Sequence, residues 1–394
     1  MSRVRTRQLF FLARSVPFWL RTFFSGLLFL GGGWLFATIA DTTPVPSPET
    51  VQEKTSETDP SGLLPVRFSL DWRWEGGVAP LAVAVEKGYF EKEGLAVTFE
   101  TAAGSKEPVE RLIAKTHDMA FGDINTLIRA YGQRQKPEAK AVLMVHDIPS
   151  FALIGRKSRG ITEDIQSLEG KKIGAPGGDA SYSLFPILKS LEPFNDESVQ
   201  FINVGFGVRD LMLAQGELDA VFGFAISTVI NIVARGIPAD DIVVLKYHDR
   251  GIQLYGNAII VSDLFAQEHP EAVRGFLRAY VKGLKDVIAD PDEGAAALAK
   301  LNEAADIAVE NERIQLLLKE NILTHWVLEN GFGNIDPKRM AKALEQLEII
   351  EPFKESVSLE QFFTDQFLPP LEERKFSANG PETTPLPVTP TPTP

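Results

Sequence analysis

The segment 66–123 constrains the fold of this chain most, because short apolar runs alternate there with residues at helical spacing. Three runs have the length and composition of buried strands, at residues 66–70, 95–100 and 118–122. Pro80 fits the first turn of a helix that ends near Gly88, and Ser105 fits the N-cap of a second helix. The order strand, helix, strand, helix, strand is the unit of a mostly parallel sheet, so we predict an α/β fold.

Polar and aromatic residues stand where these strands end. In such sheets, ligands bind in the crevice outside the carboxyl ends of the strands. Each residue alone is explained as well by a core indole or a solvated loop charge, but their concentration behind one strand favours a binding site. The candidate ligand-binding residues of this first group are Asp71, Trp72, Arg73, Trp74, Glu75, Gly104, Ser105 and Asp123.

A second series of predicted strands and helices echoes the first. The sequence HDMAFGD at residues 117–123 aligns with LDAVFGF at residues 218–224, and each follows an amphipathic helix. Only Asp, Phe and Gly match at fixed positions, so coincidence is the alternative explanation. Because both strands come late in their series, we favour two lobes of similar topology.

The second lobe contains a glycine-rich segment, GAPGGDASYS at residues 174–183, directly after a predicted strand. Glycines let the backbone approach a ligand closely, and the free amides of a helix start favour an anion or a polar atom. The Gly-Lys-Ser/Thr ending of a phosphate loop is missing, and a plain tight turn would explain the glycines equally well. The candidate ligand-binding residues of this second group are Gly177, Gly178, Asp179, Ser181, Tyr182 and Phe224.

After residue 261 the sequence has a helical pattern, with four predicted helices at residues 270–290, 293–303, 310–330 and 337–349. A block without strands does not build a third sheet, so we expect these helices to pack on the first lobe. Lobe one then comprises residues 63–156 and 253–376, and lobe two comprises residues 157–252. The chain would cross between the lobes twice, at hinges near residues 150–156 and 254–259.

The two ends of the chain differ in composition from its body. Residues 1–21 carry five arginines, and the next 19 residues, to Ala40, are uncharged and mostly apolar. Residues 1–40 are therefore expected to form an export signal or a retained inner-membrane anchor, which places the rest of the protein in the periplasm in both cases. We predict a disordered linker at residues 41–62 and a disordered tail at residues 377–394, because both are rich in proline and threonine without periodicity.

Composition argues against several classes of function. The chain has no cysteine, which excludes disulfides, thiolate metal sites and cysteine nucleophiles. Its net charge of −13 argues against nucleic acid as a partner. Its five histidines show no metal-ligand spacing, and no cofactor loop or nucleophile–base pair stands out. We therefore expect a protein without metal, cofactor or catalytic residues, and not an enzyme.

Several segments, taken in order, resemble the solute-binding proteins of importers for sulfonate, taurine, nitrate and thiamine-pyrimidine precursors. These segments are LDWRWEGGVAPLAVAVEKGYFEKEGLAVTF at 70–99, GS at 104–105, DMAFGD at 118–123, LEGKKIGAPGG at 168–178 and GELDAVFGF at 216–224. The resemblance covers about residues 64–350. It implies a two-lobed, periplasmic-binding-protein-like fold that closes on one small molecule and presents it to the permease of an ABC importer at the inner membrane. We expect such a protein to act as a monomer.

Two other functions stay open. One is an enzyme of thiamine-pyrimidine synthesis, in which Asp71 and Glu75 would be an acid–base pair. The eukaryotic synthases that share the fold carry a cysteine-rich motif, and this chain has no cysteine. The other is a membrane-tethered sensor domain, for which no output module follows the predicted body.

The charges at the strand ends bear on the class of solute. A sulfonate or nitrate needs arginine, serine and backbone amides, and nearby carboxylates repel it. Here Asp71, Glu75, Asp123 and Asp179 stand against Arg73 and Arg209, and Trp72 and Trp74 offer flat faces for stacking. We therefore expect a heteroaromatic amine such as a thiamine-pyrimidine precursor, with sulfonate, taurine or nitrate as the alternative.

Overall fold

The computed structural model describes residues 62–376, and all of these residues fall within one compact unit of the chain. The expected export signal or anchor at residues 1–40 and the expected tail at residues 377–394 lie outside the described residues. So does the expected linker, apart from Gly62. Within residues 62–376, no helix combines the length and the apolar character that a membrane crossing needs.

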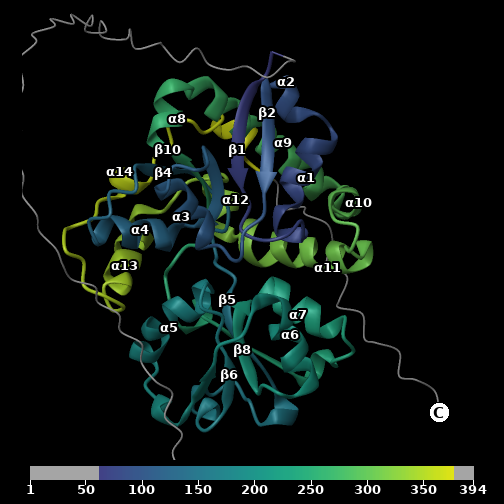
Figure 1. Ribbon diagram of the computed structural model, residues 1–394, viewed down its shortest axis with the longest axis vertical. Coiled ribbons are helices and arrows are strands. Elements are labelled where there is room, and N and C mark those ends of the chain that lie inside the picture. The colour runs from purple at the N-terminus through teal and green to yellow at the C-terminus, as the bar shows by residue number, and fades with distance from the viewer. Residues whose placement is uncertain (1–61, 377–394) are drawn as a thin grey trace, which may run out of the picture. The chain divides into compact units, whose positions relative to one another are not determined.

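One five-stranded sheet organises the first lobe, with the strand order β2-β1-β3-β10-β4 (Figure 1). Its strands are β1 Leu64–Ser69, β2 Leu95–Glu100, β3 Met119–Asp123, β4 Ala139–Met144 and β10 Asn257–Ser262. β1 is parallel to β2 and β3, whereas β10 runs antiparallel between β3 and β4. Every residue of β3 is buried, because a central strand covered on both faces exposes neither side.

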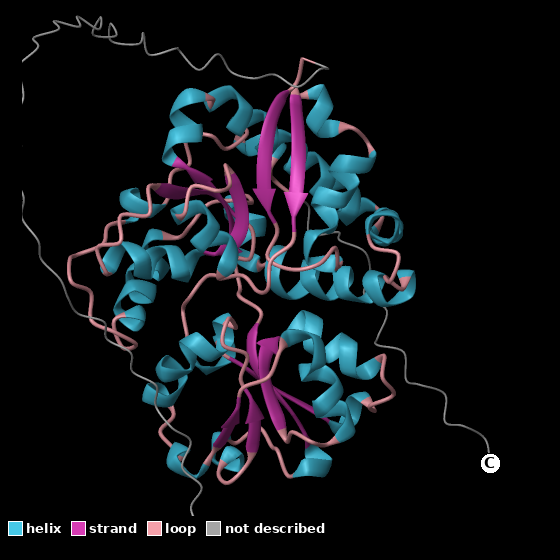
Figure 2. Cartoon of the chain, viewed as in Figure 1, coloured by secondary structure: helices cyan, strands magenta, loops and turns pink. Residues whose placement is uncertain are grey.

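A second five-stranded sheet organises the second lobe, with the strand order β7-β6-β8-β5-β9 (Figure 2). Its strands are β5 Phe151–Arg156, β6 Lys172–Gly174, β7 Gln200–Ile202, β8 Ala220–Phe224 and β9 Ile242–Lys246. β6 is parallel to β7 and β8, and β5 runs antiparallel between β8 and β9. The second sheet thus repeats the first strand by strand, and β3 and β8, which carry the two matching sequences, occupy the same central place.

Three helices, α1 (Ala79–Glu86), α9 (Pro270–Ala289) and α10 (Pro291–Leu301), share one apolar core with the first sheet. The contact between α1 and α9 depends on Gly283, because a Cβ there would lie 2.2 Å from the carbonyl oxygen of Pro80. The other helices outside lobe two are α2 Tyr89–Lys92, α3 Glu107–Ile113, α4 Ile124–Gly132, α8 Asp263–Glu268, α11 Ile307–Leu317, α12 His325–Asn330, α13 Pro337–Leu347 and α14 Leu359–Phe362.

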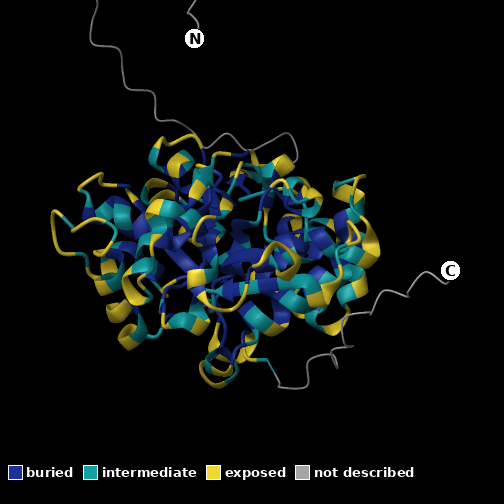
Figure 3. Ribbon diagram, turned by 90° about the horizontal axis from the view of Figure 1, so that it is seen from below, coloured by how far each residue is buried: buried dark blue, intermediate teal, exposed yellow. Residues whose placement is uncertain are grey.

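Lobe two has three helices of two turns or more around its sheet, α5 (Ala180–Leu191), α6 (Phe206–Gln215) and α7 (Ala225–Val233). α5 lies on one side of the sheet, and α6 and α7 lie on the other (Figure 1). Seen from below, buried residues concentrate in the strands and in the helix faces that cover them (Figure 3).

The chain passes from lobe one to lobe two between β4 and β5 and returns between β9 and β10. This corrects the expected lobe boundary at residue 156 and the expected hinge at residues 150–156. β5 is a central strand of the second sheet, and its first five residues are buried because β8 and β9 flank it on both sides. The expected return hinge at residues 254–259 also reaches too far, since β10 of the first sheet begins at Asn257.

The helices after β10 lie mainly against lobe one, and α11 lies where this lobe meets α7 of lobe two (Figure 1). The single helix expected at residues 310–330 is interrupted. A π-helical turn, Leu318–Ile322, follows α11, and Thr324 then starts α12 by accepting a hydrogen bond from the N–H of Val327.

Candidate functional site

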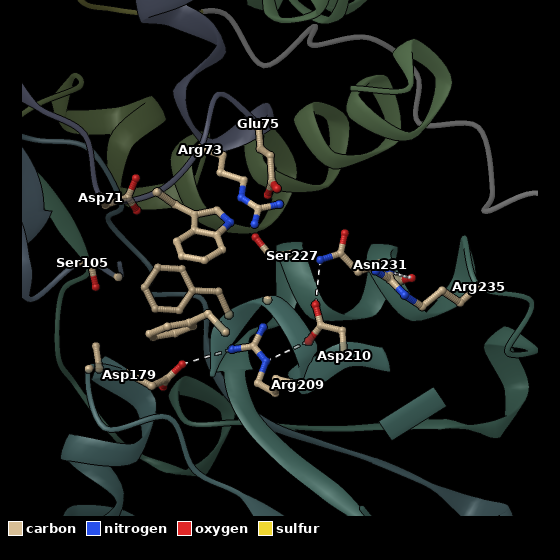
Figure 4. A pocket seen from close by; sticks show the side chains of 17 residues that line it. Asp71, Arg73, Glu75, Ser105, Asp179, Arg209, Asp210, Ser227, Asn231 and Arg235 are labelled. Atoms are coloured by element: carbon tan, nitrogen blue, oxygen red, sulfur yellow. Dashed lines mark hydrogen bonds and ion pairs between the residues drawn. The ribbon is translucent and has the colours of Figure 1, made fainter. Parts of the chain in front are cut away.

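A pocket lies between the two lobes, with about 170 Å³ accessible to the centres of water molecules (Figure 4). Lobe one contributes Asp71, Trp72, Arg73, Glu75, Gly104 and Ser105. Lobe two contributes Gly178, Asp179, Ala180, Phe206, Gly207, Arg209, Asp210, Phe224, Ser227, Asn231 and Arg235. Both lobes therefore supply aromatic and charged groups to one small volume.

Loops after the parallel strands bring the lobe-one residues together. The loop after β1 holds Asp71 to Glu75, and the carbonyl of Asp71 accepts a hydrogen bond from the N–H of Gly104 at 2.9 Å, which ties it to the loop after β2. The carbonyl of Ser105 in turn accepts from the N–H of Asp123, the last residue of β3, at 2.9 Å. Three strand ends are thus linked, as expected for the ligand-binding edge of a parallel sheet.

Two aromatic rings, one from each lobe, contact each other at the pocket. The ring centroids of Trp72 from lobe one and Phe206 from lobe two are 5.3 Å apart, with their planes at 51°. The guanidinium of Arg73 lies 5.1 Å from the Trp72 ring, and that of Arg209 lies 5.7 Å from the Phe206 ring. Beside this pair the lobes touch, because a Cβ on Gly104 would be only 3.0 Å from both the Gly178 carbonyl oxygen and Phe206.

The lobe-one carboxylates lie in poorly solvated positions. Burial raises the pKa of Asp71 to about 7, although the amide of Asn257 donates a hydrogen bond to its carboxylate at 2.7 Å. Burial also raises the pKa of Glu75, while Arg313, 3.9 Å away, acts in the opposite direction. One carboxylate oxygen of Glu75 and the hydroxyl of Ser105 are buried without a hydrogen-bond partner among the described residues. These groups are free to bind N–H or O–H donors of a solute.

The lobe-two charges pair with one another. Arg209 lies 3.3 Å from the carboxylate of Asp179, and its Nε donates to Asp210 at 2.8 Å. It also donates to the hydroxyl of Thr228 at 2.7 Å, and Asp210 accepts from the amide of Asn231 at 2.7 Å (Figure 4). Burial opposes the charge of Arg209, but the two carboxylates outweigh it and raise the pKa of Arg209. Burial raises the pKa of Asp179 as well, although Arg209 works against this.

Nine of the fourteen candidate residues line the pocket. They are Asp71, Trp72, Arg73, Glu75, Gly104, Ser105, Gly178, Asp179 and Phe224. Their role in binding a solute stays a prediction.

The structure places the other five candidates outside this lining. The Trp74 ring packs edge-on against Phe99 in the lobe-one core, with centroids 5.1 Å apart, and the Asp123 carboxylate caps α4 by accepting from the N–H groups of Asn125 and Thr126. The buried Ser181 hydroxyl donates to the Gly223 carbonyl at 2.9 Å. Tyr182 packs against Phe222, and Gly177 is exposed. Capping, aromatic packing and a hydrogen bond to the backbone therefore account for four of the five.

The lining also includes lobe-two residues that were not among the candidates. Phe206 and Gly207 open α6, where the flanking glycines at 205 and 207 resemble those already used to predict a site at residues 174–183. Ser227, Asn231 and Arg235 recur every four residues, so they share one side of the helix and the turn after it. Their spacing could have grouped them, but it does not say which side faces the other lobe. The remaining members are Ala180, Arg209 and Asp210.

No group of three or more histidines, aspartates or glutamates in residues 62–376 is arranged to hold a metal ion. The pocket lining presents carboxylates, guanidinium groups, hydroxyls and aromatic rings. This combination suits a flat molecule with polar edges, because its faces contact the rings and its edges contact the hydrogen-bonding groups.

A family model described as "NMT1/THI5 like" matches residues 76–294. The riboflavin-binding protein RibY of Chloroflexus aurantiacus is 25% identical over 298 residues, which are 74% of this chain and 82% of that protein. The formylaminopyrimidine-binding protein of Halalkalibacterium halodurans is 23% identical over 314 residues, or 78% and 91% of the two chains. The 4-amino-5-hydroxymethyl-2-methylpyrimidine phosphate synthase THI13 of Saccharomyces cerevisiae is 27% identical over 236 residues, or 57% and 68%.

Solved structures share the fold. The alkanesulfonate-binding protein SsuA of Xanthomonas axonopodis pv. citri aligns with a TM-score of 0.58 at 14% identity, covering 76% of this chain and 98% of that one. The periplasmic nitrate-binding protein NrtA of Synechocystis PCC 6803 aligns with a TM-score of 0.60 at 12% identity, covering 77% and 87%. The predicted two-lobed α/β fold is thereby confirmed.

Proposed function

The chain belongs to the NMT1/THI5-like family, and from this premise we propose that it is a solute-binding protein that captures one small molecule and delivers it to an ABC importer. The pocket carries this proposal, because its lining is divided between the two lobes. A site of this kind is complete only when the lobes are together, so binding favours the closed form. The relatives and solved structures that are named as binding proteins support the same function.

The proposed place of action is the periplasm, with residues 1–40 as export signal or anchor. The periplasmic nitrate-binding protein that shares the fold supports this location. One chain supplies the whole pocket lining, so the protein is proposed to act as a monomer with the importer permease as its partner.

The proposed solute is a flat heteroaromatic molecule with N–H groups. Trp72 and Phe206 offer one ring from each lobe, and a flat solute bound beside this pair would gain contact with an aromatic face. Asp71, Glu75 and Ser105 offer oxygen atoms at its edge. The names of two relatives, which specify riboflavin and a formylaminopyrimidine, support this class.

An anionic solute is the alternative, because the sulfonate- and nitrate-binding proteins share the fold. The charges of the pocket argue against it. The buried guanidinium of Arg209 already contacts two carboxylates, so it is not available to a sulfonate. The other two arginines of the lining, Arg73 and Arg235, are exposed, whereas Asp71 and Glu75 would repel an anion.

A thermal-shift screen followed by titration calorimetry tests the proposal. The purified protein would be offered riboflavin, 4-amino-5-hydroxymethyl-2-methylpyrimidine, taurine, an alkanesulfonate and nitrate under the same buffer conditions. We expect stabilisation by a heteroaromatic compound and none by the anions. Stabilisation by the alkanesulfonate or nitrate alone would replace the proposed solute class with an anionic one.

A pyrimidine synthase is the second candidate function, because synthases are among the relatives and the pKa of Asp71 is raised to about 7. A carboxyl with such a pKa is suited to general acid–base catalysis near neutral pH. Mass spectrometry of a bound solute before and after long incubation separates the two functions. A binding protein returns the solute unchanged, whereas an altered mass would favour the enzyme.

A further inference from the structure

Arg313 on α11 of lobe one is 2% exposed, and all five of its N–H groups have acceptors. Its Nε and one Nη2 hydrogen go to the carboxylate of Glu310 on the same helix, at 3.0 and 3.2 Å. The remaining acceptors belong to α7 of lobe two. They are the carbonyl oxygens of Ile226 and Ser227, at 3.2 and 3.3 Å, and the amide oxygen of Asn231, at 3.1 Å. Arg313 therefore spans the boundary between the lobes.

The same residues extend to the pocket from both sides. In lobe one, Glu310 accepts a hydrogen bond from the N–H of Gly76 at 2.6 Å, at the end of the loop that carries Trp72 and Glu75. The stem of Arg313 covers this position, because a Cβ on Gly76 would lie 3.0 Å from three of its carbon atoms. In lobe two, Asn231 also donates a hydrogen bond to Asp210, and Asp210 in turn accepts one from Arg209.

The partnership of Arg313 with Glu310 makes this connection reversible. Both residues are on α11, so they stay together when α11 moves away from α7. Opening would remove the α7 acceptors but would leave the guanidinium paired with a carboxylate, which avoids an unpaired buried charge. The bonds between α11 and α7 therefore favour the closed form without preventing opening.

We propose that Arg313 is a positioning residue that couples closure of the lobes to the placement of the solute-binding loop 72–75. Its contacts to α7 hold the lobes together, and Glu310 with Gly76 transmits its position to the loop. The part of the proposal that concerns the loop rests on the proposed solute-binding function. The part that concerns closure does not, because Arg313 and all of its acceptors belong to the chain itself.

The distance between the lobes in the absence of solute tests this coupling. The chain has no cysteine of its own, so two introduced cysteines give a single labelled pair. Ala304→Cys before α11 and Ala239→Cys in lobe two are both exposed and carry spin labels for a pulsed electron-resonance distance measurement. In the labelled parent we expect a population at short distance, and Arg313→Gln should lower the ratio of short to long distances by about 5- to 150-fold.

A matched control separates coupling from general destabilisation. Arg374 is also a buried arginine, but its carbonyl acceptors, Pro369 and Phe332, are both in lobe one. Arg374→Gln should therefore lower the stability of lobe one and leave the distance ratio as in the parent. Arg313→Lys keeps a charge beside Glu310 but has fewer donors, so an intermediate ratio is expected.

An unchanged ratio in folded Arg313→Gln, or an equal change in Arg374→Gln, would overturn the proposal. If Arg313→Gln does not fold, Asn231→Ala removes the one side-chain acceptor among the three on α7, at a partly exposed position, and an unchanged ratio there overturns the proposal equally. These outcomes are independent of the solute. If Arg313→Gln lengthens the distance but the parent protein binds none of the screened compounds, the coupling stands and the proposed solute class is removed.

Discussion

The two lobes have the same scaffold but use the corresponding residues differently. In both sheets an Asp–Phe–Gly pattern starts just before the central strand and continues into it, at residues 118–122 for β3 and at residues 219–223 for β8. The residue that follows differs, and so does its task. Asp123 caps α4 in lobe one, whereas Phe224 in lobe two starts α7 without a side-chain cap and lines the pocket. The repeated residues therefore build the sheet, and the residue after them is free to vary.

The repeated aspartate shows what the pattern preserves. Asp118 accepts a hydrogen bond from the N–H of Arg67 in β1 at 2.8 Å, and Asp219 accepts from the N–H of Lys172 in β6 at 2.9 Å. Each aspartate also pairs with an arginine, Arg67 in one lobe and Arg159 in the other. The repeated carboxylates thus hold neighbouring strands in register, at the end of the sheet away from the pocket.

The lobes differ most in how they treat pocket charge. In lobe two, Asp179 and Asp210 both pair with Arg209, and these three residues form an ionic cluster. In lobe one, Asp71 has only an amide as side-chain donor, and one oxygen of Glu75 has no hydrogen-bond partner among the described residues. The pocket carboxylates of lobe two are therefore paired within the protein, whereas those of lobe one keep oxygen atoms that can accept hydrogen bonds from a solute.

The largest effect should come from breaking the ionic cluster of lobe two. Arg209→Ala leaves two buried carboxylates without their cation, so we expect a loss of about 3–5 kcal/mol in the free energy of unfolding. Urea unfolding at neutral pH measures it, with Arg235→Ala as the exposed pocket control. A loss as small as that of Arg235→Ala would show that the ionic cluster does not stabilise the fold. It would also remove the contrast in how the two lobes treat pocket charge.

The aromatic pair offers a second test. Trp72→Ala removes the lobe-one face, so the affinity for the heteroaromatic solute should fall by about 1–3 kcal/mol, or roughly ten- to a hundredfold. Titration calorimetry measures the affinity. Trp74→Phe, which alters the neighbouring indole in the core, should change stability and leave the affinity as in the parent. The opposite pattern would mean that the second indole carries the stacking.

The pH dependence of stability sharpens the difference in charge. Burial raises the pKa of Asp71 to about 7, whereas the unfolded chain loses this proton near pH 3.9. The folded form therefore holds more protons between about pH 4 and pH 7, and stability falls as the pH rises through that window. Asp71→Asn removes the titration and should gain about 1–3 kcal/mol over the parent at pH 8, with no gain at pH 4.

A lobe-two variant controls this measurement by denaturant unfolding at both pH values. Asp219→Asn removes a carboxylate that Arg159 pairs with, so no gain at pH 8 is expected. An equal gain in both variants would mean that net charge, rather than burial of Asp71, sets the dependence.

The smallest effect concerns the residue at the end of β3. Asp123→Ala removes the cap of α4 and should lower the free energy of unfolding by about 0.5–2 kcal/mol, with no change in solute affinity. Asp123→Ser retains an N-cap oxygen and should recover most of the loss. A loss of affinity in Asp123→Ala that Asp123→Ser does not restore would return this carboxylate to the binding site.

The lobe-one half of the pocket can be predicted from the sequence because its residues directly follow strands. A strand end fixes where its loop lies, so Asp71 and Ser105 could be predicted to converge. The sequence does not show which of Trp72 and Trp74 lines the pocket, since both follow β1 and only packing decides which indole enters the core. Strand ends likewise identified Gly178 and Asp179 in lobe two.

The helical part of lobe two gave no such local signal. Asp210 and Asn231 lie inside α6 and α7, and the side of a helix that faces the pocket depends on how two distant lobes meet. The boundary between the lobes before β5 cannot be placed from the sequence for a similar reason. Phe151–Arg156 has the composition of a strand in either sheet, and only pairing with β8 and β9 assigns it to the second.

The two links between β4 and β5 and between β9 and β10 restrict how the lobes move. A body held by one flexible strand behaves as a ball joint with three rotational degrees of freedom, whereas two separate attachments leave essentially one. Side chains brace the first link, since Asn321 donates to the Ile148 carbonyl at 2.8 Å and Arg339 pairs with Asp147 at 3.1 Å. With both links in place, the second lobe would return Phe206 to Trp72, and α7 to Arg313, along the same path each time the lobes close.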